Sequence, residues 1–185
     1  GMFILLSGSG FCQKVVQERP CREAFLEAYD NYQNKNYALS FEQFSTFIEA
    51  YRDNDDAFLQ DAFFFKAAAS CQMMNNDADV LLLSYIKRYP QSLHTNDAYF
   101  LLANFYTQNN QYDKALSVYR QMNTSILDQE KKYEYAYKYG HCLFMQGNYD
   151  EALTEFDKVK DAKSKYASPS TYFYAHILYE QKKYN

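Results

Sequence analysis

The stretch that decides the fold runs from residue 99 to residue 119 and reads YFLLANFYTQNNQYDKALSVY. Residues 136–156 repeat its pattern as AYKYGHCLFMQGNYDEALTEF. In each stretch a small residue, Ala103 or Gly140, stands among large apolar residues that recur at helical spacing. A turn rich in Asn, Gln or Gly follows, and a second helical run then begins with Tyr and carries an alanine three residues later. Each stretch therefore predicts two helices joined by a short turn.

Small residues recur in the same way along most of the chain. On the first helices they stand at intervals of 35 to 39 residues, at Ala28, Ala67, Ala103, Gly140 and Ala175. On the second helices they stand at intervals of 37 or 38 residues, at Ser40, Ala78, Ala115 and Ala152. Because two antiparallel helices approach closely only where side chains are small, these positions are predicted to mark the contact inside each helix pair. Each pair keeps a further apolar face for its neighbour.

The pattern resembles the tetratricopeptide repeat family, whose repeats carry a small residue on the first helix and an alanine on the second. The resemblance implies an all-α fold, a right-handed superhelical solenoid of antiparallel helix pairs with about four and a half repeats. The repeats are expected near residues 21–55, 56–93, 95–125 and 127–164, with a half repeat at 168–185. Residues 85–92 and 97–100 are most similar to bacterial envelope members, such as the outer-membrane assembly lipoprotein and the Tol-Pal coordinator.

Nine helices are expected from the period and the turn signals. Their predicted ranges are 21–34, 38–52, 56–74, 77–89, 95–109, 112–123, 127–146, 149–160 and 168–182. The last helix has no partner in the sequence. It is either a cap or half of a repeat cut from a longer protein. Terminal caps are polar outside, so the aromatic residues Tyr172, Phe173, Tyr174 and Tyr179 favour the second interpretation.

Residues 1–20 precede the first predicted repeat. Gly1 stands before Met2, and the segment from Phe3 to Gln13 is first apolar and then small, which is similar to the end of a secretory leader. It lacks a basic start, and its apolar run is short. We expect a leader remnant or a disordered N-terminal segment, and hence a periplasmic or envelope-associated protein after export, with a cytoplasmic protein as the alternative.

Composition excludes several classes of function. The chain has 185 residues with 19 Lys+Arg against 23 Asp+Glu and a formal net charge of -4, which does not favour nucleic-acid binding. Five scattered glycines form no phosphate-binding loop, so no cofactor is expected. The cysteines lack zinc spacing, and Cys71 and Cys142 are expected to be buried apolar residues. No run approaches the ~20 apolar residues of an integral membrane segment.

Residues of the first helices that are not needed inside the pairs are predicted to line a concave groove. One column is aromatic throughout, at Phe25, Phe64, Phe100, Tyr137 and Tyr172. Two further columns vary in size and polarity: Tyr29, Ala68, Asn104, His141 and His176, and then Tyr32, Cys71, Thr107, Phe144 and Tyr179. These columns either bind a peptide or pack neighbouring first helices together. The binding candidates are Phe100, Asn104, Tyr137, His141, Phe144, Tyr172 and His176.

No motif of these residues points to catalysis, and His141 with His176 lacks the further ligands of a metal site. We therefore expect a non-enzymatic scaffold that binds a partner protein or peptide in its groove, in a bacterial envelope complex. One alternative is a structural or assembly subunit that oligomerises through its convex face or its open C-terminal end, for instance as a homodimer through the half repeat. Another alternative is a regulatory domain of a larger enzyme.

Overall fold

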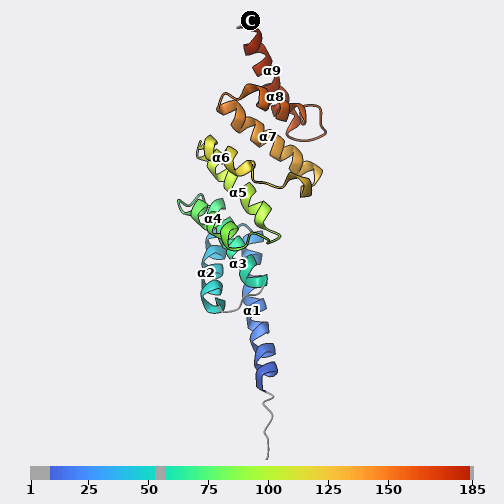
Figure 1. Ribbon diagram of the computed structural model, residues 1–185. Coiled ribbons are helices and arrows are strands. Elements are labelled where there is room, and N and C mark those ends of the chain that lie inside the picture. The colour runs from blue at the N-terminus through green and yellow to red at the C-terminus, as the bar shows by residue number, and fades with distance from the viewer. Residues whose placement is uncertain (1–8, 53–56, 184–185) are drawn as a thin grey trace, which may run out of the picture. The chain divides into compact units, whose positions relative to one another are not determined.

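The structure is a computed structural model that describes the backbone of residues 9–52 and 57–183 and the side chains of residues 20–52 and 57–182. Over these residues the chain forms nine α-helices and one short 3-10 helix, with no strand (Figure 1). The predicted all-α class is confirmed. The helices follow the predicted order and are joined in pairs by turns of a few residues.

The chain divides into two compact units, Gly1–His94 and Thr95–Asn185. The first contains α1 (Ser9–Gln33), α2 (Tyr37–Tyr51), α3 (Ala57–Gln72) and α4 (Ala78–Arg88). The second contains α5 (Thr95–Gln108), α6 (Tyr112–Tyr119), the 3-10 helix (Thr124–Ile126), α7 (Gln129–Met145), α8 (Tyr149–Asp157) and α9 (Ala167–Lys183).

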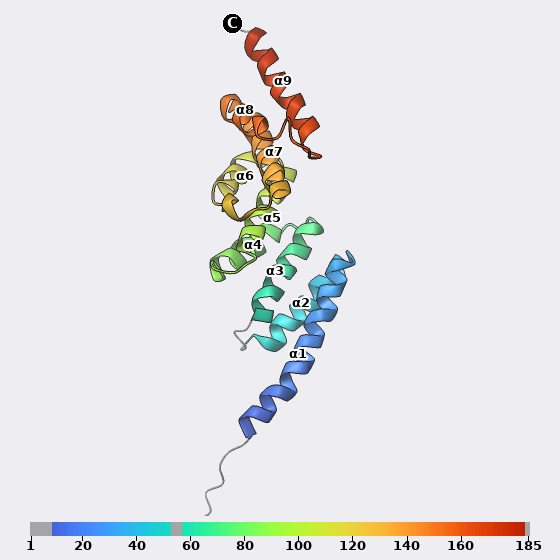
Figure 2. The same ribbon diagram turned by 90° about the vertical axis from the view of Figure 1, so that its right-hand side faces the viewer.

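Each unit is built from consecutive helix contacts. In the first unit α2 packs against both α1 and α3, and α3 packs against α4, as Figure 2 shows. In the second unit α5 pairs with α6 and α7 pairs with α8, while α6 also touches α7. Helix α9 rests on α8 and α7. Sequential packing of this kind is the arrangement expected of a helical repeat protein, in which each repeat contacts mainly the repeats next to it in the sequence.

The two helices of a pair touch at the predicted small residues. The Ser40 hydroxyl donates a 2.9 Å hydrogen bond to the carbonyl oxygen of Ala28, so α2 lies in direct reach of the backbone of α1. At Gly140 an added Cβ would lie 3.0 Å from the Phe156 ring, which leaves no room for a side chain between α7 and α8. Eight of the nine predicted small positions are buried.

Ala175 is the ninth position, and it is exposed. In α3, α5 and α7 the equivalent small residue is covered by the second helix of its own pair. Within the described part of the chain no helix follows α9, so nothing packs against Ala175 from that side. The prediction that Ala175 marks a helix contact is therefore wrong for this structure.

Neighbouring pairs are joined by stacked phenylalanine rings. Phe44 of α2 and Phe65 of α3 stack with their centroids 5.8 Å apart and their planes 19° apart. Phe156 of α8 and Phe173 of α9 stack in the same way, at 5.4 Å and 12°. Both pairs occupy the same places in the repeat, because the second-helix ring follows the small residue by four positions and the first-helix ring precedes its small residue by two. Offset stacking adds roughly 0.5–1.5 kcal/mol to the apolar burial of such rings.

A residue with positive φ ends the first helix of each pair. Lys35 has φ 63°, Asn110 has φ 57° and Gly147 has φ 77°, and all three stand five residues before the small residue of the following helix. Met74, with φ 56°, ends α3 four residues before Ala78. The left-handed conformation closes each helix and directs the chain into the turn.

Helix α1 begins earlier than predicted. The predicted start is residue 21, directly after Pro20, and proline ordinarily disturbs the interior of a helix. The structure instead continues the helix from Ser9 through Pro20 to Gln33. Residues 9–20 are therefore helical rather than disordered, whereas the part of the predicted leader that covers residues 1–8 lies outside the described residues.

Candidate functional site

Five of the seven predicted binding residues gather around one ring of the second unit, that of Phe173. Three of them project from one face of α7 at the spacing i, i+4, i+7. The ring centroids of Phe144, His141 and Tyr137 lie 5.1, 5.3 and 6.5 Å from that of Phe173. We call the whole set the α7–α9 aromatic cluster; its members are Tyr137, His141, Phe144, Tyr172, Phe173 and His176.

The remaining two members of the cluster stand one turn apart on α9. Tyr172 lies 5.3 Å from Phe173, and its ring is nearly parallel to that of His176, with centroids 6.1 Å apart. His176 in turn lies 5.7 Å from Phe144 of α7. Ring contacts thus connect α7 and α9 across the whole cluster, and each ring restricts the orientations of its neighbours.

Exposure divides the cluster into a floor and a rim. Tyr137, His141, Phe144 and Phe173 are half-buried and form the floor. The rim is open, because Tyr172 is 65% exposed and His176 is also exposed. Exposed rings of α9 therefore lie beside half-buried rings of α7.

Two titratable groups of the floor, His141 and Tyr137, are uncharged near pH 7. Burial lowers the pKa of His141 and raises the pKa of Tyr137. Both groups are therefore uncharged in neutral solution, where the imidazole offers one donor and one acceptor and the phenol offers a hydroxyl. The surface suits apolar and aromatic side chains, with a few positions for hydrogen bonds.

Phe100 and Asn104 lie on α5, apart from this cluster. The Asn104 side-chain oxygen accepts a 3.0 Å hydrogen bond from the Tyr119 hydroxyl, so this amide already joins α5 to α6. The Phe100 ring lies 6.3 Å from that of Tyr119 and carries the Lys138 ammonium 5.1 Å from its centroid. Asn104 therefore stabilises the α5–α6 pair, and Phe100 contacts both this pair and the following helix α7.

In the first unit the aromatic column belongs to the core. Phe25 and Phe64 are each only 6% exposed. Phe25 packs against Phe44 at 5.6 Å, and Phe64 stacks flat on His94 at 4.4 Å and 5°. Of the two interpretations of this column, packing between helices is the one that holds here.

The predicted binding residues did not include Phe173, the residue on which the cluster is centred. It stands next to Tyr172, which was assigned to the aromatic column, and adjacent helical positions point in different directions. The repeat register contained the signal, because Phe65 holds the same place in α3 and faces the preceding pair through Phe44. Tyr166 was missed as well; its ring stacks on Tyr137 at 5.5 Å, and it precedes the first residue of α9.

The cysteines and acidic residues supply no reactive centre in the described residues. Cys21, Cys71 and Cys142 are buried, as predicted for the last two. Burial raises the pKa of the Cys71 thiol to about 11, which keeps it protonated and unreactive at neutral pH. Over the described ranges, no three His, Cys, Asp or Glu side chains come close enough to bind a metal ion. None of the described helices combines the length and apolar character needed to cross a membrane.

One family of known proteins matches part of the chain. Residues 83–159 match the family described as anaphase-promoting complex, cyclosome, subunit 3. No curated protein is similar to this chain.

Solved structures resemble the chain over most of its length. A tetratricopeptide repeat protein from Parabacteroides merdae ATCC 43184 matches with a TM-score of 0.71 and 16% identity, over 88% of this chain and 61% of that one. The Podospora anserina putative kinesin light chain with nearly identical repeats, as a Q17M variant, matches with a TM-score of 0.67 and 14% identity, over 89% and 87%. MamA matches with a TM-score of 0.57 and 12% identity, over 84% and 95%.

Identities this low show the fold alone, and the chain spans about three fifths of the length of the Parabacteroides protein. The matched segment and the three neighbours agree with the helical repeat arrangement described above. Together they support a tetratricopeptide repeat fold for this chain.

Proposed function

We propose that this protein is an interaction scaffold whose second unit binds a partner peptide on the α7–α9 aromatic cluster. The observation that carries the proposal is the gathering of Tyr137, His141 and Phe144 around Phe173, beneath a rim at which Tyr172 is 65% exposed. A surface of this kind binds apolar or aromatic side chains by stacking and orients the peptide by hydrogen bonds to the imidazoles and the phenol.

Preorganisation is the physical basis of the proposed affinity. Neighbouring rings already restrict the floor residues in the absence of a ligand. Binding then orders the peptide but immobilises few side chains of the protein, each of which would otherwise cost about 0.5–1.5 kcal/mol. The absence of charge on His141 and Tyr137 at neutral pH also avoids a desolvation penalty.

Partner capture by variants of the exposed rim tests this proposal without disturbing the core. Tyr172→Ser with His176→Ser removes two exposed rings, and we expect the captured partner to be lost while the unfolding temperature stays unchanged. Leu83→Ser is the matched control, because Leu83 is 47% exposed on α4, in the other unit. A floor variant, Tyr137→Ala with His141→Ala, is expected to lose capture as well. Unchanged capture by the rim variant would remove the cluster from the binding surface.

An assembly role is the second candidate, and the open side of α9 favours it. Tyr172 and Tyr179 are 65% and 63% exposed and Leu178 is 37% exposed. An apolar patch of this kind is a place where a second copy can pack. Concentration-dependent dimers in sedimentation, lost in a Tyr172→Ser, Tyr179→Ser variant, would support this role, while a monomer at all concentrations would exclude it.

We also propose a non-catalytic role in the bacterial envelope. What supports it is the similarity of residues 85–92 and 97–100 to envelope repeat proteins and the apolar-then-small order near the N-terminus. Fractionation of cells that produce the natural gene product tests this location. Recovery of the protein with the cytoplasmic fraction alone would reject it.

A further inference from the structure

A groove on the first unit lies on the side of the α1–α2 pair that does not receive α3. Its volume is about 360 Å³. The α1 residues that line it are Ala24 and Glu27, and the α2 residues are Glu42, Gln43, Thr46, Phe47, Ala50 and Tyr51. The proposed peptide-binding cluster lies in the other unit, so the groove is a separate surface.

Small residues on the two facing helices make the hollow. Ala24 of α1 and Ala50 of α2 leave space over Phe47, which is only 3% exposed and forms the apolar floor. Carboxylates stand at the rim, on Glu27 and Glu42. None of the ion pairs between described side chains involves either carboxylate.

A hydrogen-bonded ladder holds the rim in place. The Gln43 amide donates a 2.9 Å hydrogen bond to Oε1 of Glu27, and its own oxygen accepts a 2.9 Å hydrogen bond from the Asn31 amide. The Glu27 carboxylate is thereby oriented without being neutralised. The groove combines an apolar floor with fixed negative charge.

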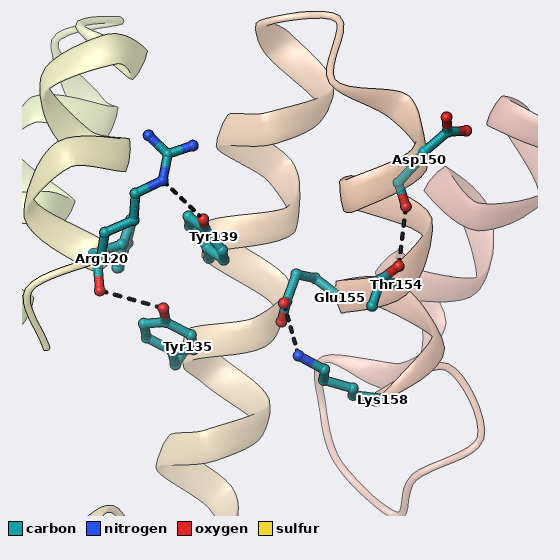
Figure 3. A network of polar contacts seen from close by, with 8 residues as sticks. Arg120, Tyr135, Tyr139, Asp150, Thr154, Glu155 and Lys158 are labelled. Carbon is teal, nitrogen blue, oxygen red and sulfur yellow. Dashed lines mark hydrogen bonds and ion pairs between the residues drawn. The ribbon is translucent and has the colours of Figure 1, made fainter. Parts of the chain in front are cut away.

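On the same side of the α7–α8 pair, α6 packs against α7 in the second unit. The repeat register equates Glu27 with Tyr139, Gln43 with Glu155, and Thr46 with Lys158, each 112 residues later. Figure 3 shows Tyr139 beside the end of α6, where the Arg120 side chain donates a 3.3 Å hydrogen bond to the Tyr139 hydroxyl. Glu155 and Lys158 form an ion pair with each other on the α8 side.

The end of α6 also places an aromatic ring on this face. Tyr119 is fully buried, its ring lies 5.9 Å from that of Tyr139, and its carbonyl oxygen accepts a 3.2 Å hydrogen bond from the Tyr135 hydroxyl. The occupant in the second unit is therefore an amphipathic helix that ends in a tyrosine followed by an arginine.

The α3–α4 pair shows a second occupied example. Lys66 of α3 holds the place of Glu27 and Tyr139, one residue before the small residue of its helix. Its ammonium lies 5.1 Å from the centroid of the Phe41 ring, on the preceding helix α2. In both occupied cases this position contacts the helix that docks on the pair.

We propose that the α1–α2 groove binds an amphipathic helix of a partner protein that presents an aromatic or large apolar side chain next to an arginine or lysine. The apolar side chain packs over Phe47 in the space left by Ala24 and Ala50. The basic side chain pairs with Glu27 and Glu42, where the occupied counterpart of Glu27 offers only the neutral phenol of Tyr139. Acidic residues at this rim select a basic helix by charge complementarity.

The probe that tests this is a helix-stapled, fluorescein-labelled peptide with the sequence of residues 112–123, which contains Tyr119 and Arg120. Binding to the full chain is followed by fluorescence anisotropy in low salt. The matched peptide carries Arg120→Glu. We expect the basic peptide to bind, and the acidic one to bind at least about tenfold more weakly, because like charges then meet at the rim.

Two groove variants report on the proposal independently. Glu27→Gln with Glu42→Gln keeps the shape and removes the charge, and we expect binding of the basic peptide to weaken about tenfold. Ala24→Arg fills the hollow from within and is expected to abolish binding. Asp30→Asn with Glu49→Gln removes two exposed charges of the same helices outside the groove lining, and it should change binding by less than about twofold.

Three results would overturn the proposal. The first is equal binding by the groove variants and the wild type, with unchanged unfolding temperatures. The second is loss of binding only in the Tyr172→Ser, Tyr179→Ser variant, which would place the peptide on α9. The third is a dimer of the protein alone that Ala24→Arg dissolves, since the groove would then bind a second copy rather than a partner. The result of the rim experiment on the α7–α9 aromatic cluster does not affect this test.

Discussion

Helices α3 and α9 hold the same place in their repeats but differ in what covers them. On the side that meets the preceding pair they agree, because Ala69 and Ile177 are 0% and 1% exposed. On the other side they diverge: Phe64 is 6% exposed, whereas its counterpart Tyr172 is 65% exposed. Phe64 is covered by Tyr85 of α4 at 5.5 Å and by the stacked ring of His94.

The repeat register and the neighbouring helices thus determine the burial of different faces of a helix. The repeat register determines which residues of a helix face the preceding pair, and the stacked rings at Phe65 and Phe173 show that it does so in both units. Whether the opposite face is buried depends on the helix that follows. The candidate site of this protein exists because the rim of α9 remains open while the same face of α3 is filled.

The largest effect is expected from removal of the stacked rings. Phe65→Ala should lower the free energy of unfolding by about 3 kcal/mol, because α3 is packed on both sides and a cavity remains. Phe173→Ala should cost about 2 kcal/mol, because α9 is covered on one side and can adjust. Urea unfolding of each variant measures both values. Equal costs would show that the covering of the opposite face does not matter.

A matched pair at the small positions sharpens the comparison. Ala67 is buried and Ala175 is exposed. Ala67→Leu should therefore destabilise the protein by roughly 2 kcal/mol through overpacking against α4. Ala175→Leu should change stability by less than about 0.5 kcal/mol, because leucine forms helices nearly as well as alanine and meets no neighbour there. A large cost at Ala175 in thermal unfolding would mean that this face is occupied in solution.

Turn residues test positions whose backbone conformation follows from the repeat register and does not depend on a covering helix. Lys35 and Gly147 share one left-handed position, and a Cβ on Gly147 would meet no atom within 4 Å. Gly147→Ala should cost about 1 kcal/mol from backbone strain alone. Lys35→Gly should relieve such strain. Because glycine loses more backbone entropy on folding, the net increase in the free energy of unfolding should be only about 0.5 kcal/mol. Differential scanning calorimetry of both variants would check the opposite signs.

The smallest effect is expected from His141 of the cluster. Burial lowers the pKa of His141 below that in the unfolded chain, so the unfolded state binds more protons as the pH falls. The stability that depends on neutral His141 is present above pH 6.5 and should be lost as the pH falls through the lowered pKa. His141→Gln should flatten the fall of the unfolding temperature between pH 7.5 and pH 5.

The helix pairs could be predicted from the sequence because small residues mark the contact inside each pair. Eight of those nine residues are buried, and only Ala175 departs from the pattern. Pro20 misled the prediction for the start of α1, since local preference ends a helix there while the structure continues it.

The candidate site was harder to predict than the fold. The periodic columns selected Tyr137, His141 and Phe144 but also Phe25, which is a core residue. A column identifies a face of a helix, yet it does not say whether another helix covers that face. Asn104 shows the same limit, because its amide is bound by Tyr119, a partner 15 residues away that no spacing rule connects to it.

The buried thiols allow the opening of each unit to be timed separately. Cys21 and Cys71 lie in the first unit and Cys142 in the second, and all three are buried. A thiol reagent modifies such groups only during transient unfolding, so its rate reports the opening free energy of the surrounding structure. With Cys12 replaced by serine, variants that keep a single buried cysteine would give a separate modification rate for each unit. A ligand should then lower the modification rate only in the unit that it binds.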